Sequence, residues 1–355
     1  MSKARIAING FGRTGRCLAR QIYNSSALDL VAINSRSLLN PYLLTYDSVY
    51  GRFDASVKLE EKIKAAGKKT IKEMFLTIDK HSVPVYQGDE PIAAPWAELD
   101  IDIVVDATGN FPTIKEISDH LEAGAKYVVM TYPPKDKDIK TIMVGVNEEL
   151  YALPKEDKDI TNMIISAGSC TALALAPVLK YLDVQYGVND AHVLVTHCYT
   201  DSQNLLDNSN KDAWRARAAP LNIIPTTTGA QDNVIAVLPT LEGKITCMAN
   251  RVPVACGSQL FIVAEVTKDA SAKEINDYFT FLTQKQAGDV LGICTEPVCS
   301  SYFRGDTHNA VIDPTWTAVH DKRVRMVAWF DNEWGYTSRL IALLEHIAKK
   351  KKKWF

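Results

Sequence analysis

The sequence predicts an α/β protein with two domains, and three observations support this prediction. The 355 residues are too many for one comfortable hydrophobic core. Residues 4–34 have the pattern of a strand, a glycine turn, a helix and a second strand. From residue 191 onward the expected strands are longer and rich in β-branched residues, which is typical of a mainly antiparallel sheet.

Composition excludes several classes of function. The net charge of −2 argues against non-specific nucleic-acid binding, which needs a strongly basic surface. No apolar run approaches the roughly 18 residues of a membrane span, so we expect no membrane partner. The seven cysteines include no CxxC pair, which predicts neither a metal site nor a disulfide framework. Together with an N-terminus that has no signal-peptide pattern, this favours a reducing, cytoplasmic location.

The glycine turn fits the fingerprint of a dinucleotide-binding, or Rossmann, unit. Strand 4–9 is followed by Gly10-Phe11-Gly12-Arg13-Thr14-Gly15 and then by a helix-like stretch, 16–25. In this fingerprint the first glycine permits a tight turn, the second lets the backbone approach a pyrophosphate, and the third lets helix and strand pack closely. The first amides of the helix then face the phosphates.

Further elements complete the two domains. We expect strands over 29–34, 101–109, 127–132 and 139–147, and a helix that begins at Cys170. The antiparallel-type strands are 191–200, 244–254, 258–266 and 324–331, and the last helix is 337–350. We therefore predict a Rossmann domain over 1–168, with a C-terminal helix, 335–355, packed back on it, and an α+β domain over 169–334. The lysine run 349–353 is expected to be a solvated helix end, with a docking tail as the alternative.

Cys170 is the first candidate for chemistry. A thiol reacts as its thiolate, and a helix N-terminus lowers the pKa of a cysteine placed there. Ser169 can cap this helix, and Thr171 falls in its first turn. His197, near the end of a strand in the same domain, is a candidate base. Two other interpretations stay open at this point: that Cys170 is an inert core residue, and that His197 is structural.

Several longer segments resemble one known family. NGFGRTGR, YDSVYGRF, DATGNF, SCT, THCYT, RARAAPLNIIPTTTGA, MANRVP and WFDNEWGYTSR occur in the order and spacing of phosphorylating glyceraldehyde-3-phosphate dehydrogenases. The resemblance runs almost end to end. It implies a homotetramer and a reaction of glycolysis or gluconeogenesis, with the direction left open.

The resemblance implies a role for each matching residue. Cys170 would attack an aldehyde to form a thiohemiacetal, and His197 would keep the thiol ionised and act as general base for hydride departure. Phosphate would then cleave the acyl thioester to give 1,3-bisphosphoglycerate. Ser169, Thr171, Thr228 and Gly229 match the inorganic-phosphate site, and Thr200 and Arg251 match the substrate-phosphate site. The implied cofactor contacts are the residues of the glycine turn (Gly10, Phe11, Gly12, Arg13, Thr14 and Gly15) with Ser35, Arg36, Thr108, Gly109, Thr131, Asn208, Ser209 and Asn332.

The chain departs from the family around its cysteine. It reads SAGSCTAL where the family usually reads SNASCTTN, so the side-chain amides that brace this loop are gone. Either the helix start is held in another way, or catalysis is weakened. Ser202 stands where many members carry an aspartate, and Gln231-Asp232-Asn233 replaces a usual Ala-Lys-Ala.

Two further departures concern the cofactor. NAD-specific Rossmann domains place an acidic residue after the second strand, but here Ser35 and Arg36 follow it. Asn208 and Ser209 replace the Leu-Pro pair of NAD-specific members, a polar change similar to those in NADP-using plastid relatives. These positions favour NADP, and the alternative is that Arg36 faces solvent and NAD also binds.

Three alternatives to this function remain open: an erythrose 4-phosphate dehydrogenase, a catalytically degenerate nucleotide-binding or regulatory paralogue, and a non-phosphorylating route in which water attacks the thioester. Retention of Cys170, His197 and Arg251 argues against the paralogue. We expect the other cysteines to take no part in chemistry, including Cys198, which alternation along its strand turns to the other face from His197.

Overall fold

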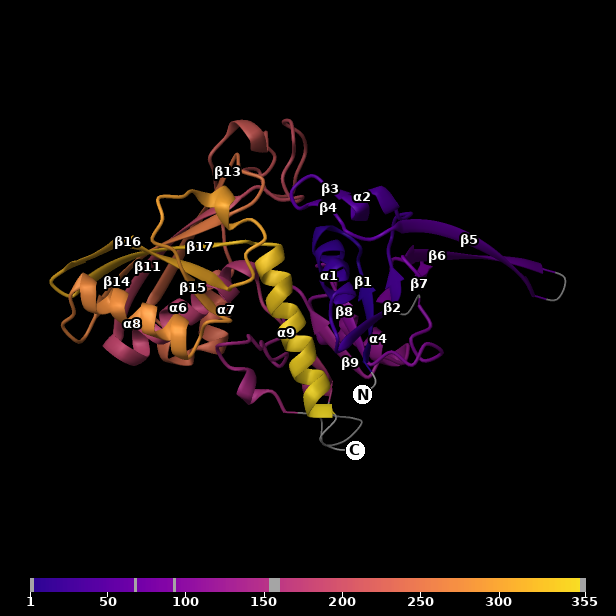
Figure 1. Cartoon of the computed structure of the whole chain (residues 1–355), viewed down its shortest axis with the longest axis horizontal. Coiled ribbons are helices and arrows are strands. Elements are labelled where there is room, and N and C mark those ends of the chain that lie inside the picture. The colour runs from indigo at the N-terminus through magenta and orange to yellow at the C-terminus, as the bar shows by residue number, and fades with distance from the viewer. Residues whose placement is uncertain (1–2, 67–68, 92–93, 153–159, 352–355) are drawn as a thin grey trace. The chain divides into compact units, whose positions relative to one another are not determined.

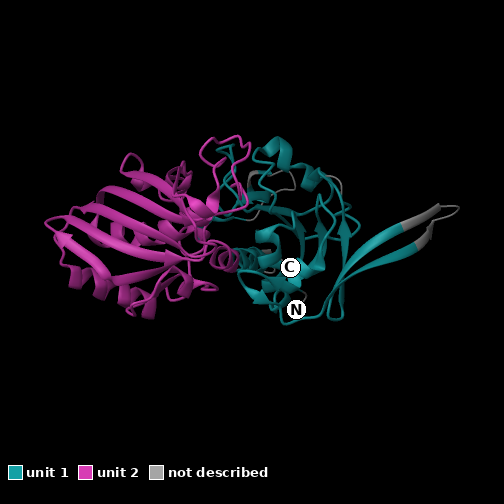
Figure 2. Cartoon of the chain, turned by 90° about the horizontal axis from the view of Figure 1, so that it is seen from above, with its two compact units in different colours: residues 1–142, 149–168, 340–355 teal, residues 143–148, 169–339 magenta. Residues whose placement is uncertain are grey.

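The computed structural model describes residues 3–66, 69–91, 94–152 and 160–351. Its contacts divide the chain into two compact units, coloured separately in Figure 2. Unit 1 comprises residues 1–142, 149–168 and 340–355, and unit 2 comprises residues 143–148 and 169–339. Within the described part of the chain, no helix is long and apolar enough to cross a membrane.

Unit 1 is built on an eight-stranded sheet in the order β10-β9-β8-β1-β2-β7-β6-β5. The strands from β10 to β7 run parallel, and β7, β6 and β5 form an antiparallel edge that ends in a long hairpin (Figure 1). The strands are β1 Ala4–Asn9, β2 Leu28–Asn34, β5 Val57–Ala66, β6 Lys69–Ile78, β7 His81–Tyr86, β8 Ile103–Asp106, β9 Tyr127–Met130 and β10 Ile164–Ser166. A two-stranded ribbon, β3 Tyr46–Asp47 and β4 Gly51–Arg52, lies outside this sheet.

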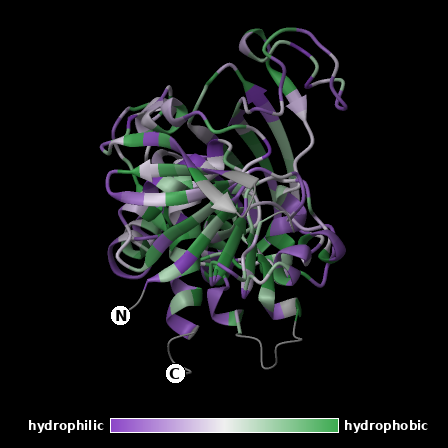
Figure 3. Ribbon diagram, turned by 90° about the vertical axis from the view of Figure 1, so that its right-hand side faces the viewer, coloured by the Kyte–Doolittle hydropathy of each residue, from purple (hydrophilic) through white to green (hydrophobic). Residues whose placement is uncertain are grey.

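Helices of different lengths accompany the sheet of unit 1. Its helices are α1 Arg13–Tyr23, α2 Pro41–Thr45, α3 Ile114–Ile117, α4 Asp119–Glu122, α5 Ile160–Met163 and the larger part of α9 Trp334–Lys351. Leu18 and Ile22 of α1 are buried, as are Ile6 and Ile8 of the neighbouring β1. Each such side chain contributes about 1.5–3 kcal/mol by leaving water. Figure 3 shows hydrophobic segments concentrated along the strands.

Unit 2 is built on a seven-stranded sheet in the order β12-β13-β11-β14-β17-β16-β15. Four of its pairs are antiparallel, and two, β11 with β13 and β15 with β16, are parallel. The strands are β11 Val188–Cys198, β12 Ile224–Thr226, β13 Ile245–Val252, β14 Ser258–Val266, β15 Leu291–Ile293, β16 Ala310–His320 and β17 Arg323–Phe330.

Three helices of unit 2 cover one face of this sheet (Figure 1). They are α6 Cys170–Tyr186, α7 Ala230–Val237 and α8 Ala272–Lys285, and the short 3-10 turns are η2 Glu148–Leu150, η3 Ala219–Leu221, η4 Pro239–Leu241 and η5 Ser300–Phe303. Helix α6 is apolar on nearly all sides, with buried residues from Thr171 to Leu182, because α7 and the sheet both pack against it. Its first turn is thereby held in a fixed position.

The predicted fold class is confirmed, but one predicted strand is wrong. Residues 139–147 form a turn, and only an isolated bridge joins Thr141 to Ser166. Gly145 has a φ of +87°, and Asn147 closes the turn by accepting the amide of Met143 through its Oδ1 at 2.8 Å. The strand beside β9 is instead β10.

The C-terminal helix packs within unit 1 from Leu340 onward. Glu345 accepts a hydrogen bond from Ser25, and the ring of His346 lies against that of Tyr151. In the lysine run 349–353, Lys350 donates to the carbonyl of Tyr151. Residues 352–355 lie outside the described part of the chain.

Candidate active site

The carboxyl ends of four parallel strands of unit 1 meet at one edge of its sheet. Asn9 at the end of β1 is level with the last residues of β2 and β8, and the last residue of β8 is level with that of β9. The residues that follow these strands, including Gly10, Ser35, Thr108 and Thr131, therefore share this edge, which we call the strand-end edge. Strand order reverses between β1 and β8, and dinucleotides bind at such reversals.

The three glycines of the first turn each meet a different steric requirement. Gly10 has a φ of +95°, and a Cβ there would lie 2.9 Å from the carbonyl carbon of Ala107. A Cβ on Gly15 would lie 2.2 Å from the oxygen of Gly10. At Gly12, by contrast, no atom of the described residues lies within 4 Å of the Cβ position. Gly12 therefore borders open space in front of α1.

The open space beside Gly12 lies in front of the backbone amides in the first turn of α1, which can donate hydrogen bonds to an anion. No side chain of the described residues caps α1, and its first turn carries no acidic residue. Phe11 is buried, Thr14 is half-buried, and Arg13 is held by an ion pair with Asp47 at 2.6 Å. The glycine turn and helix start therefore fit the pyrophosphate of a dinucleotide.

A buried polar network supports the strand-end edge. Asp106 has no exposed surface, and its carboxylate accepts hydrogen bonds from Asn9 at 2.6 Å, from Thr108 at 2.6 Å and from His120 at 3.1 Å. Burial acts to raise the pKa of Asp106, but these donors outweigh it and lower the pKa. The network fixes Thr108 and the turn at Gly109, whose φ is +72°.

Cys170 is the first residue of α6, as the sequence predicts. Ser169 is its N-cap and accepts the amide of Ala172 at 3.2 Å, which confirms the predicted cap. The Sγ of Cys170 lies 3.6 Å from Nε2 of His197, a buried residue near the end of β11. The structure therefore brings the two predicted partners together.

Burial shifts the pKa values of both groups toward their neutral forms. Burial raises the pKa of the Cys170 thiol, although the nearby charge of Arg251 and hydrogen bonds from Thr171 oppose it. Burial, and then Arg251, lower the pKa of His197 to about 3. Removal from water therefore opposes the helix start and the charge of Arg251, which both favour the thiolate.

Arg251 reaches both His197 and the predicted substrate-phosphate threonine. It lies directly opposite His197 in the parallel pairing of β13 with β11. Its Nη1 is 2.9 Å from Nδ1 of His197, 2.9 Å from the carbonyl oxygen of Cys198 and 3.4 Å from Oγ1 of Thr200. We call Cys170, His197, Arg251 and Thr200 the thiol cluster.

The structure adds Arg215, which the sequence analysis did not single out. Its guanidinium donates to Thr226 and, at 3.2 Å, to Oγ of Ser202, which in turn lies 3.0 Å from Oγ1 of Thr200. Ser202 thus links a second arginine to the thiol cluster. Arg215 lies within the motif RARAAPLN, so its family match was the available signal.

The predicted phosphate residues Thr228 and Gly229 form the turn before α7. Oγ1 of Thr228 accepts the amide of Ala230 at 3.2 Å, and Gly229 is exposed. Asn233, one of the unexplained departures, is buried and donates from Nδ2 to the carbonyl of Gly229 at 2.9 Å. Asn233 therefore braces this turn from within the helix.

Cys198 also contacts a predicted cofactor residue. Its thiol donates to Oδ1 of Asn332 at 3.0 Å, and Ser258 donates to the same oxygen at 3.5 Å. Burial raises the pKa of Cys198 to about 12, so the thiol stays protonated and remains a donor. The amide nitrogen of Asn332 is thereby turned away from both donors.

Comparison with known proteins agrees with this arrangement. The family model "Glyceraldehyde 3-phosphate dehydrogenase, NAD binding domain" matches residues 4–114, and "Glyceraldehyde 3-phosphate dehydrogenase, C-terminal domain" matches residues 169–332. Glyceraldehyde-3-phosphate dehydrogenase 2 of Bacillus subtilis (strain 168) is 39% identical over 99% of this chain and 98% of its own length.

The chain belongs to the glyceraldehyde-3-phosphate dehydrogenase family.

Other relatives span the family. Glyceraldehyde-3-phosphate dehydrogenase from Mycobacterium avium is 38% identical over 97% of this chain and 98% of its own length. Chloroplastic glyceraldehyde-3-phosphate dehydrogenase A of Chlamydomonas reinhardtii is 40% identical over 98% of this chain and 90% of its own length. Enzymes of this family are NAD(P)-dependent oxidoreductases, so the predicted family, enzyme class and nicotinamide dinucleotide are confirmed.

The loop that departs from the family pattern is held by other groups. Asn309, a buried residue, donates from Nδ2 to the carbonyl of Leu173 at 2.8 Å, within the first turn of α6. The amide of Gly168, whose φ is +70°, donates to Oγ of Ser166 at 2.9 Å. These bonds and the Ser169 cap brace the cysteine loop without the family's usual asparagines.

The predicted cofactor-selecting residues fall in two separate places. Ser35 is half-buried at the strand-end edge, and its amide donates to the carbonyl of Tyr86 at 3.1 Å. Arg36 is exposed, and its side chain makes no ion pair with any described residue. Asn208 and Ser209 lie in an exposed loop of unit 2, where Asn204 donates to both carbonyls.

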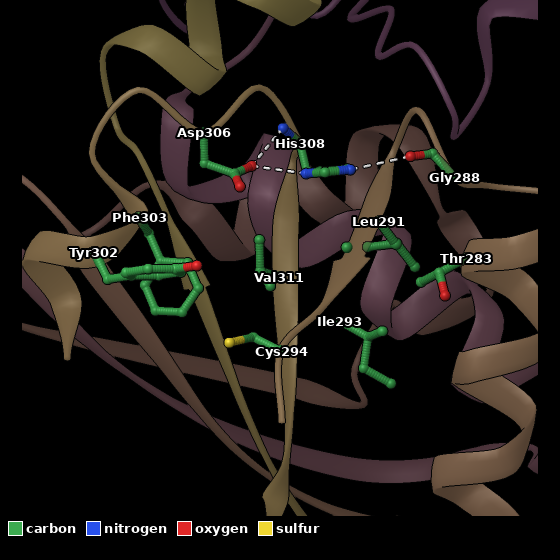
Figure 4. A pocket seen from close by; sticks show the side chains of 11 residues that line it. Thr283, Gly288, Leu291, Ile293, Cys294, Tyr302, Phe303, Asp306, His308 and Val311 are labelled. Carbon is green, nitrogen blue, oxygen red and sulfur yellow. Dashed lines mark hydrogen bonds and ion pairs between the residues drawn. The ribbon is translucent and has the colours of Figure 1, made fainter. Parts of the chain in front are cut away.

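A further cavity of about 380 Å³ lies in unit 2, lined by none of the predicted site residues. Figure 4 shows His308 between Asp306, 2.7 Å from Nδ1, and the carbonyl of Gly288, 3.0 Å from Nε2. Both ring nitrogens face acceptors, which favours the protonated imidazole, and the hydrogen bond to Asp306 raises the pKa of His308. Among the described residues, no group of three or more potential ligands could hold a metal.

Proposed function

We propose that this chain is a phosphorylating glyceraldehyde-3-phosphate dehydrogenase in which Cys170 is the nucleophile and His197 is the base. The observation that carries the proposal is the 3.6 Å contact between Cys170 Sγ and His197 Nε2 at the start of a capped helix. A thiol, a base within reach and an adjacent arginine are the parts that acyl transfer through a thioester requires.

Each step uses a group in the thiol cluster. The proton of Cys170 Sγ passes to Nε2 of His197 as sulfur bonds to the aldehyde carbon. His197 then returns this proton to the new oxyanion, which gives a thiohemiacetal and leaves Nε2 free. His197 next takes the hydroxyl proton of that adduct as the carbon–hydrogen bond breaks, which leaves an acyl thioester. Phosphate oxygen then attacks the thioester carbon, and Cys170 departs as the sulfur leaving group.

Two anion sites serve these steps. Arg251, Thr200 and Arg215 hold the phosphate of the substrate, because their donors converge around Thr200. The hydroxyls of Ser169, Thr171 and Thr228 and the exposed turn at Gly229 hold the attacking phosphate. Ser202 stands where many family members carry an aspartate, so a hydroxyl lies beside Thr200 at that position.

We assign dinucleotide binding to residues 1–168 with helix 335–355, and catalysis to 169–334. The glycine turn would hold the pyrophosphate, with Thr108, Gly109 and Thr131 along the same edge and Asn332 as the donor to the nicotinamide carboxamide. When bound, the dinucleotide supplies the acceptor for the substrate's hydride. NADP is preferred, because no carboxylate follows β2 and the exposed guanidinium of Arg36 suits a 2′-phosphate.

The active form is a homotetramer. The segment 199–223 of unit 2, which carries Asn208 and Ser209, exposes the large apolar side chains of Leu205, Leu206, Trp214, Leu221 and Ile223. Such a concentration of exposed apolar surface favours burial against another copy. Sedimentation should give the mass of four chains, and a monomer at micromolar concentration would refute this part.

Steady-state kinetics test the function. With glyceraldehyde 3-phosphate, we expect turnover that depends on inorganic phosphate and a larger kcat/KM with NADP than with NAD. Ser35→Asp should reverse that cofactor preference, because a carboxylate repels a 2′-phosphate and binds ribose hydroxyls. Faster turnover of erythrose 4-phosphate would reassign the substrate, and no turnover with either aldehyde would indicate a nucleotide-binding paralogue.

A further inference from the structure

Tyr132, the second residue after β9, makes contacts that no step of the proposed function uses. Its hydroxyl lies 2.9 Å from Oδ1 of Asp106 and 3.3 Å from the carbonyl oxygen of Phe111. A phenol has a single proton to donate, and the carboxylate is both the nearer and the charged acceptor, so the hydrogen bond goes to Asp106. Burial and the negative charge of Asp106 raise the pKa of Tyr132, which therefore remains a donor.

The hydroxyl of Tyr132 shares its acceptor with Thr108. Oδ1 of Asp106 also accepts the amide of Thr108 at 3.0 Å and its hydroxyl at 2.6 Å. Oδ2 is held separately, by Asn9 at 2.6 Å and by His120 at 3.1 Å. Tyr132 and Thr108 are thus joined through one carboxylate oxygen, and the position of that oxygen determines where the turn at Thr108 lies along the strand-end edge.

The backbone of Tyr132 holds a second segment, the loop that leads to Cys170. Oγ of Ser166 donates to the carbonyl oxygen of Tyr132 at 2.8 Å, and the same Oγ accepts the amide of Gly168 at 2.9 Å. Gly168 has a φ of +70° and directly precedes Ser169, the N-cap of α6. Because Ser166 has no exposed surface, loss of either bond would leave a buried polar group unpaired.

Packing makes the hydroxyl and the carbonyl of Tyr132 move together. The ring packs against a buried apolar cluster formed by Ile117, Val128, Met130, Ile139 and Ile164. Only the χ1 and χ2 torsions separate the ring from the backbone, and a side chain packed on a core can change neither of them freely. A displacement at the hydroxyl is therefore transmitted to the carbonyl, and the reverse also holds.

We propose that Tyr132 is a positioning residue for both halves of the reaction. Through Asp106, its hydroxyl positions the turn at Thr108, which is part of the proposed dinucleotide site. Through Ser166, its carbonyl positions the loop that delivers Cys170. The inference rests on the proposed function of these two sites, and Tyr132 itself touches neither substrate nor dinucleotide.

Fluorescence titration with NADP, and in parallel with NAD, tests the first half. Tyr132→Phe keeps the ring and its packing and removes only the hydroxyl. We expect the Kd of the dinucleotide to rise by roughly three- to tenfold, because a charge-assisted hydrogen bond that orients Asp106 is lost. Tyr86→Phe is the matched control, since Tyr86 is half-buried in the same unit and its hydroxyl donates to no described residue. Its Kd should equal that of the wild type.

A double substitution tests whether Tyr132 acts through the turn at Thr108. Thr108→Val removes the hydroxyl that shares Oδ1 of Asp106 and should itself weaken dinucleotide binding. In that background Tyr132→Phe should cause little further loss, because the turn is already released. Losses that multiply in the double variant would show that the two residues act independently and would overturn the proposal.

Alkylation of Cys170 by iodoacetamide, an uncharged reagent, tests the second half without dinucleotide or aldehyde. Ser166→Ala breaks the bond to the Tyr132 carbonyl and should slow alkylation several-fold, because Cys170 loses its fixed position beside His197. Tyr132→Phe should slow alkylation by a smaller factor and add nothing in the Ser166→Ala background. A wild-type alkylation rate in Tyr132→Phe would confine this residue to the strand-end edge and overturn its shared role.

These readouts separate the positioning role from the proposed function. If no aldehyde is oxidised, the proposed function fails, while the Kd and the alkylation rate still report on Tyr132. If the wild type oxidises glyceraldehyde 3-phosphate and Tyr132→Phe keeps the wild-type Kd and alkylation rate, Tyr132 is only a packing residue. The inference then fails and the function stands.

Discussion

The strand-end edge of unit 1 and the thiol cluster of unit 2 are assembled in opposite ways. The strand-end edge presents mainly backbone groups to a ligand. Its key positions are Gly10, Gly12 and Gly15, where the lack of a side chain permits the close approach of other backbone or leaves open space. The thiol cluster is made of side-chain atoms from α6, β11 and β13, which lie far apart in sequence and meet through strand register and helix packing.

The difference predicts how each region fails. An added atom should damage the strand-end edge, because its function depends on open space and close backbone approach. A removed atom should damage the thiol cluster, because single atoms carry its chemistry. Substitutions that respect or violate this division can therefore test it.

The largest effect is expected from one atom of the thiol cluster. Cys170→Ser exchanges sulfur for oxygen, whose proton is far harder to remove, so kcat should fall by about four orders of magnitude or more. Dinucleotide affinity and the unfolding transition should match the wild type. Retention of more than a few per cent of kcat would show that another group is the nucleophile.

At the strand-end edge, two glycine substitutions should separate stability from binding. A Cβ at Gly15 would meet the Gly10 oxygen at 2.2 Å, so Gly15→Ala should lower the free energy of unfolding by about 2 kcal/mol or more. Gly12→Ala should leave stability nearly unchanged and weaken dinucleotide binding at least tenfold. Urea unfolding and fluorescence titration measure the two quantities, and equal losses of stability would contradict the division.

A smaller effect should appear where Cys198 orients Asn332. Cys198→Ala removes the shorter of the two hydrogen bonds to Oδ1 and leaves only that of Ser258, so the KM for the dinucleotide should rise by about tenfold with little change in kcat. Cys198→Ser keeps a donor and is the matched control, with a KM near the wild-type value. A kcat loss with unchanged KM would instead place the effect on His197.

The smallest effect concerns His308, outside both regions. Its folded pKa is raised above the unfolded value, so its ion pair with Asp306 stabilises the fold fully below about pH 6.5 and is lost as pH rises through the folded pKa. Since the pair is partly exposed, His308→Gln should cost about 1 kcal/mol near pH 6 and less near pH 9. The same cost at both pH values would refute the assigned protonation.

The features that depend on contiguous residues could be predicted from the sequence. The strand, glycine turn and helix of 4–23 follow from local pattern, and so does the capped helix that begins at Cys170. His197 and Arg251 were identified through motifs, but their pairing follows from strand register, which no motif states.

Prediction from the sequence was wrong or incomplete where contacts between residues far apart in the chain determine the structure. The segment 139–147 is apolar enough for a strand, but the backbone turns at Gly145. Asn309 supports the first turn of α6 from far along the chain, and nothing in its local pattern indicates this. The raised pKa of the Cys170 thiol follows from burial, which opposes the effect of the helix start and is visible only in the folded chain.

Trapping the covalent intermediate tests the central claim most directly. The protein is mixed with glyceraldehyde 3-phosphate and NADP without phosphate, quenched in acid, and analysed by peptide mass spectrometry. We predict one acyl group on the peptide that contains Cys170, none in Cys170→Ser, and its rapid loss when phosphate is added. Reduction of NADP with no acylated Cys170, or acylation of another cysteine, would contradict the assignment of Cys170 as the nucleophile.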